Sequence, residues 1–69
     1  MAQGEERHLQ AAQTHDAAAL RHDEAAAHWE EVGDERRADL ERRNAHIERL
    51  AAELERERAV LVAEEAASA

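Results

Sequence analysis

The first half of the chain repeats its polar and apolar positions every seven residues. Histidines stand seven apart at His8, His15 and His22, and Trp29 takes the next place in the series. Small or apolar residues fill the intervening positions, so that the spacing alternates between three and four: Ala11, Ala18, Ala25 and Val32. Such a spacing is typical of a helix that packs along one face. It predicts a helix over about residues 5–32.

The second half carries a heavier apolar stripe with similar spacing. Its large side chains are Leu40, Ile47, Leu50, Leu54 and Leu61, and the stripe is completed by Asn44, Ala51 and Arg58. This pattern predicts a second helix over about residues 35–66. Each half also has a stripe made of alanines alone, seven residues apart: Ala12, Ala19 and Ala26, then Ala38, Ala45, Ala52 and Ala59. Each predicted helix therefore has two faces that are suited to packing.

One short stretch, Val32-Gly33-Asp34, interrupts the helical pattern. Glycine adopts the left-handed backbone conformation that ends many helices, and aspartate accepts backbone hydrogen bonds where a helix begins. We expect Gly33 and Asp34 to form a tight turn between antiparallel helices. The predicted fold is all-α, a single two-helix hairpin over residues 1–69. One continuous helix through Gly33 is the alternative, at a local cost of about 1 kcal/mol.

Large apolar side chains are too few to stabilise an isolated hairpin. The 69 residues include only twelve of them, and a small domain needs more buried surface than these supply. We expect two hairpins to pair into an antiparallel four-helix bundle with two-fold symmetry. Asn44 and Arg58 would then set the register of the helices. The predicted interface and core residues are Ala11, Ala18, Ala25, Trp29, Leu40, Ile47, Leu50, Leu54 and Leu61.

Composition narrows the range of partners. The net charge is −8, whereas nucleic acids and anionic membranes attract clustered positive charge, so neither is expected as a direct partner. No apolar run reaches the roughly 20 residues that span a bilayer, and no signal peptide is recognisable. Cysteine is absent and all nine basic residues are arginine. These features predict a cytoplasmic protein from a GC-rich, bacterial genome.

Much of the charge is expected on outward faces, in pairs three or four residues apart on one helix. The predicted pairs are Asp39–Arg43, Arg37–Glu41, Arg49–Glu53 and Glu55–Arg58. Pairs of this kind add little stability each, so they indicate a solvated face and not a binding site.

The line of histidines has three interpretations. The rings could pack and hydrogen-bond in the seam, or they could make an interface sensitive to pH. They could also bind zinc, nickel or copper at His8, His15 or His22, if a second chain supplies another copy of the same histidine. Buried neutral rings would make the protein less stable as the pH falls, whereas rings paired with carboxylates would have the opposite effect.

The turn also predicts a register between the helices. Folding about Gly33 and Asp34 sets residue i near residue 67−i, which places His22 beside Asn44 and His46. Consecutive histidines of the line then stand about 10 Å apart along the helix, which is too far to share one ion.

No catalytic constellation is recognisable, so we do not expect an enzyme. The chain has no cysteine nucleophile, glycine-rich phosphate loop or His-Glu-x-x-His motif, and it implies no cofactor beyond the transition metal considered above. Trp29 is the only aromatic residue. We expect its ring to plug the closed end of the hairpin near Ala38 and Leu40; an exposed anchor for a partner is the alternative.

Residues 25–43, AAAHWEEVGDERRADLERR, resemble the helix–Gly–Asp–helix junction of tetratricopeptide-type hairpins. The other signature positions of that repeat and a second copy are missing, and a single repeat cannot bury its own face, so we assign no family.

The sequence predicts a small acidic hairpin that self-associates as a module for protein–protein interaction or assembly. Its partner is itself, as a homodimer or a higher oligomer, or another helical protein. A metal-binding or pH-sensitive helical bundle is the alternative. An acidic decoy that captures a nucleic-acid-binding protein is a further one, because a charge of −8 attracts a basic surface.

Overall fold

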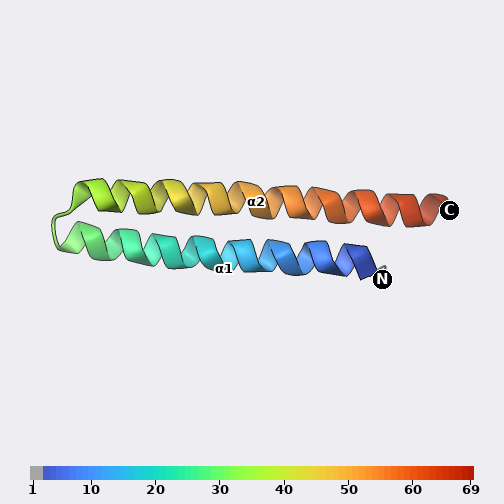
Figure 1. Cartoon of the computed structure of the whole chain (residues 1–69), viewed down its shortest axis with the longest axis horizontal. Helices are drawn as coiled ribbons and strands as arrows, with labels where there is room; N and C mark the ends of the chain where they lie inside the picture. The colour runs from blue at the N-terminus through green and yellow to red at the C-terminus, as the bar shows by residue number, and fades with distance from the viewer. Residues whose placement is uncertain (1–2) are drawn as a thin grey trace.

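The computed structural model describes residues 3–69 as two antiparallel helices joined by a tight turn (Figure 1). Helix α1 spans Gln3–Glu31 and helix α2 spans Glu35–Ser68. The two form a rod whose Cα atoms extend over 56 × 13 × 9 Å, and α2 continues beyond the start of α1 at the open end. The predicted all-α hairpin is therefore confirmed, and the alternative of one continuous helix is wrong.

The turn is built from a few backbone hydrogen bonds. Gly33 has a φ of +82°, the left-handed conformation that suits glycine. Its N–H donates to the carbonyl of Glu30 at 3.1 Å, and the N–H of Asp34 donates to the carbonyl of Trp29 at 2.8 Å. This pair of bonds is the Schellman motif, which closes the last turn of a helix. Helix α1 therefore ends here because glycine permits the reversal.

Asp34 begins the second helix directly after the turn. Its carboxylate accepts a hydrogen bond from the backbone N–H of Arg37 at 3.0 Å and another from the Arg37 guanidinium at 2.6 Å. The backbone bond is the larger of these two causes that hold the pKa of Asp34 below its ordinary value. Asp34 thus closes the end of α1 through its backbone N–H and caps the start of α2 through its carboxylate. Because no linker separates the two helices, they form a hairpin.

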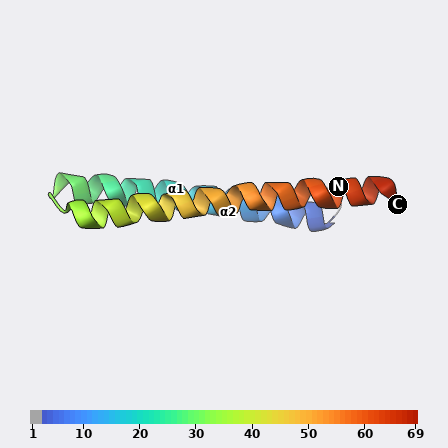
Figure 2. The same cartoon turned by 90° about the horizontal axis from the view of Figure 1, so that it is seen from above.

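Alanines form the contact between the two helices. Among the side chains that the structure describes, the buried apolar residues are Ala12, Ala19 and Ala26 of α1 and Ala38, Ala45, Ala52 and Ala59 of α2. We call these seven residues the alanine seam. Alanine is short, so two helices can approach closely wherever alanines face one another, much as small residues permit close helix pairs elsewhere. The helices cross as they run along the seam (Figure 2).

The two helices meet through their alanine stripes and not through the stripes that hold the larger side chains. Ala11, Ala18 and Ala25 are only half-buried beside the seam. The five large side chains of α2 are 46–61% exposed: Leu40, Ile47, Leu50, Leu54 and Leu61. None of these residues belongs to the buried contact between α1 and α2, because the alanine stripes allow a closer approach and leave charged residues to pair on both flanks. Their place in an interface between copies stays a prediction.

Candidate functional site

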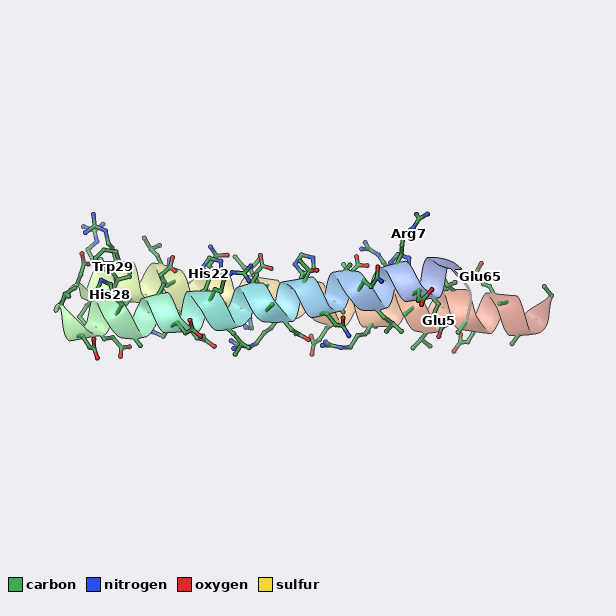
Figure 3. All side chains as sticks on the ribbon, turned by 90° about the horizontal axis from the view of Figure 1, so that it is seen from below. Glu5, Arg7, His22, His28, Trp29 and Glu65 are labelled. Carbon is green, nitrogen blue, oxygen red and sulfur yellow. The ribbon has the colours of Figure 1, made fainter. Side chains whose placement is uncertain are left out.

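The three histidines lie along one flank of the alanine seam, each opposite a glutamate of α2. The Nδ1 atoms of His8 and His15 are 2.7 Å from carboxylate oxygens of Glu55 and Glu48, respectively. His22, labelled in Figure 3, is 3.1 Å from Glu41 in the same way. These rings are about one-third exposed at the surface of the seam. The histidines therefore pair with carboxylates. Glu41, the partner of His22, lies about one helical turn before Asn44 and His46, which the predicted register placed beside His22.

Glu55 is the most engaged of the three glutamates. It also accepts a hydrogen bond from the guanidinium of Arg58, three residues further along α2. The hydrogen bond from His8, and to a lesser extent that from Arg58, holds the pKa of Glu55 below its ordinary value. This carboxylate therefore stays ionised under acidic conditions in which a free glutamate begins to take up a proton.

His8, His15 and His22 each have one carboxylate partner, which is too small a set for a metal ion. Within residues 3–69 no group of three or more His, Asp or Glu side chains stands close enough to hold one. A structural zinc site takes four ligands. The metal layer at His8, His15 or His22 needs a second copy of the chain and stays a prediction.

The opposite flank of the seam carries a second row of ion pairs. The guanidinium groups of α2 pair with carboxylates of α1 as Arg42–Glu30, Arg49–Asp23 and Arg56–Asp16. We did not predict these pairs from the sequence, although the three arginines and their three carboxylate partners each recur every seven residues. Asp39–Arg43 and Glu55–Arg58 do form along α2. Arg49 pairs with Asp23 across the hairpin in place of Glu53.

Trp29 closes the flank at the turn, where it is half-buried. The guanidinium carbon of Arg37 lies 5.1 Å from the centre of the indole ring, within the range of a cation–π contact. The ring of His28 meets it edge-on, with 5.0 Å between the ring centres (Figure 3). Trp29 is thus partly covered by Arg37, an arrangement between the buried plug and the exposed anchor.

A row of exposed apolar side chains lies on the outer side of α2. Each residue turns a helix by about 100°, so a residue two positions after a seam alanine points away from α1. Leu40, Ile47, Leu54 and Leu61 all hold this position, and Leu50 lies beside them; we call these five residues the leucine stripe. A shallow surface hollow opens at Leu50 and Leu54, and another at Leu61. The stripe thus offers ridges and hollows to a partner helix.

Polar residues border the leucine stripe on both sides. Asn44 is half-buried between the stripe and the histidine flank, and Arg58, in the same column, is exposed and bound to Glu55. Arg36 and Arg43 are exposed near the start of α2, whereas Glu57 and Glu64 are exposed towards its end. The surface therefore combines an apolar centre with charges of opposite sign at its two ends.

Comparison of the chain with models of protein families, with curated proteins and with solved structures finds no match. Neither helix, over residues 3–68, has a stretch that is long and apolar enough to cross a membrane. The leucine stripe is therefore the feature of the hairpin surface that indicates a function.

Proposed function

We propose that this chain is a self-associating helical hairpin that acts as a module for protein–protein interaction or assembly. The leucine stripe is the observation that supports this function. Its five large side chains are each about half exposed and lie on one face of α2. Continuous apolar surfaces on soluble proteins mark sites of association, because covering them releases ordered water.

The composition of the seam supports the same conclusion. The contact within the hairpin buries alanines, whose side chains remove little apolar surface from water. Covering the leucine stripe adds the large side chains that the hairpin leaves exposed. A dimer of two hairpins is the simplest assembly that does this, and another helical protein with a complementary apolar face is the other candidate partner.

The test compares two substitutions of the same kind on different helices. Ile47, in the leucine stripe, is 61% exposed, and Leu20, on α1, is 59% exposed. We expect the unmodified protein to sediment as a species heavier than the 7.7 kDa chain. Ile47→Glu should shift it towards the monomer, because a buried carboxylate opposes association. Leu20→Glu should leave the mass unchanged.

Two results would contradict the proposal. One is an unmodified protein that sediments as a 7.7 kDa monomer at every concentration tested and melts cooperatively in that state. The other is an equal loss of association in both variants, which would move the interface away from the stripe. Far-UV circular dichroism at the same concentrations reports whether each variant keeps its helices.

The histidine–glutamate pairs favour a second candidate function, a pH-sensitive or metal-binding assembly. Each of these histidine rings faces a carboxylate, so a series of melting temperatures from about pH 8 to about pH 5 tests whether the pairs respond to acid. Near these rings stand Glu41, Glu48 and Glu55, with Arg58 attached to the last. A profile that is flat, or that is unchanged after His15→Gln, would count against the pH response.

The metal version of this second candidate has its own measurement. Zinc, nickel or copper should raise the melting temperature if a second copy completes a site, since an ion bound by the folded state stabilises it. The shift should vanish in His15→Ala or His22→Ala. No shift at an excess of each ion would remove metal binding from consideration.

A further inference from the structure

We propose that the leucine stripe docks on a second copy of the same helix, with the two α2 helices antiparallel. This inference rests on the proposed self-association and specifies its geometry. It is carried by the order of charges along α2, which differs between the two ends of the stripe.

One column of α2 changes sign at its midpoint. The positions seven residues apart beside Leu40, Ile47, Leu54 and Leu61 are occupied by Arg36, Arg43, Leu50, Glu57 and Glu64. Arginine thus precedes Leu50 twice and glutamate follows it twice. All four charged side chains are exposed. Within residues 3–69, the hairpin forms no ion pair with Arg36, Glu57 or Glu64, and it pairs Arg43 only with Asp39, at 3.0 Å.

Only one orientation of two identical helices satisfies these charges. A parallel copy in register sets this column against the column on the other side of the stripe, so that Arg36 meets Arg37 and Glu64 meets Glu65 of the other copy. An antiparallel copy that packs Leu50 against Leu54 brings Arg43 to about one helical turn from Glu57 on the other copy. Arg36 then has the same relation to Glu64, and two-fold symmetry repeats both attractions. Arrangements of charge beside an apolar seam select the orientation of coiled-coil helices in this way.

The neighbouring column gives a second reason for the antiparallel arrangement. It contains Asn44, Ala51 and Arg58, and Ala51 lies close to the midpoint of the stripe. In the antiparallel pair Ala51 faces its own copy. Asn44 faces Arg58 of the other copy, where the side-chain oxygen of Asn44 can accept a hydrogen bond that the Arg58 guanidinium donates. The antiparallel pair has one cost, because Glu53 meets its own copy near the symmetry axis.

The outer edge of α1 offers no comparable stripe, so the assembly closes at two copies. Its outward positions are mostly polar, with Arg7, Thr14, Arg21 and His28 in one column and Gln10, Ala17, Glu24 and Glu31 in the next. The four helices then lie in one layer, in the order α1, α2, α2 and α1. This layer takes the place of a square four-helix bundle, because the stripe points directly away from α1.

The experiment exchanges the charges and follows the dissociation constant of the dimer by analytical ultracentrifugation. Arg43→Glu and Glu57→Arg are made singly and together. Each has a matched control on the outer edge of α1, Arg21→Glu and Glu24→Arg, with the same change in net charge on an exposed residue. Each single exchange should weaken the dimer about tenfold, because two symmetry-related attractions become repulsions. The double variant should recover the original constant, and both controls should match the unmodified protein.

The outcomes separate this geometry from self-association itself. Recovery in the double variant, after losses in both single variants, supports the antiparallel pair. Single exchanges that behave like their controls, or a double variant that recovers nothing, overturn it, because a parallel pair does not set Arg43 against Glu57. If Ile47→Glu still abolishes association in that case, the proposed function stands without this geometry. An unmodified protein that stays monomeric overturns both.

Discussion

Ala45→Leu tests whether the alanine seam sets the distance between the helices. Ala45 is completely buried, and its heptad neighbours along α2, Ala38 and Ala52, are equally inaccessible. On α1 the seam continues with Ala19 and Ala26, which are 1% and 4% exposed. A leucine at this position adds three carbon atoms where no side chain has room for them. The two helices must separate locally or the new side chain must leave the seam.

The expected loss can be set against the gain. Three extra carbon atoms would contribute about 2 kcal/mol if they were fully buried. To bury them, however, the helices must part, and the contacts of Ala19 and Ala26 and the ion pairs on both flanks weaken together. Forcing large side chains into packed sites typically costs about 1–3 kcal/mol. For a chain of this size, that corresponds to a fall in melting temperature on the order of 10 °C.

Thermal unfolding followed by circular dichroism measures the effect, at one fixed protein concentration because association contributes to stability. The matched control is Ala27→Leu on the exposed surface of α1, which should change stability by less than about 0.5 kcal/mol. If Ala45→Leu melts at or above the temperature of the unmodified protein, the seam does not limit the approach of the helices, and our account of the packing is refuted.

Two further predictions concern the turn and the response to acid. Gly33→Ala should destabilise the hairpin by about 1–2 kcal/mol, because φ is +82° although the new Cβ would meet no atom within 4 Å. Gly4→Ala, whose Cβ would stand 3.6 Å from Val62, should melt no lower than the unmodified protein, and a fall as large as that of Gly33→Ala would contradict the backbone explanation. Asp34 and Glu55 have lowered pKa values in the folded chain, so the stability they contribute is present above their ordinary pKa values and is lost as the pH falls through the lowered ones. The melting temperature should therefore drop between about pH 5 and about pH 3, and Glu55→Gln should show a smaller drop; an identical drop would refute this role.

The helices and the turn follow from local chemistry, and the sequence alone indicates them. A seven-residue repeat favours helix wherever it occurs, and the pair Gly33-Asp34 stops one helix and starts the next through bonds among its close neighbours. These interactions join residues at most a few positions apart. The fold class could therefore be predicted before any packing was known.

The pairing of faces depends on both helices at once, and only the tertiary structure decides it. Several stripes of α1 and α2 share the same seven-residue period, so periodicity alone cannot rank them. The alanine stripes meet because they permit the closest approach and, at that distance, leave His8, His15 and His22 opposite glutamates and three arginines opposite Asp16, Asp23 and Glu30. The leucine stripe is left exposed for the same reason: two rods that touch through their smallest residues must turn their largest ones outward.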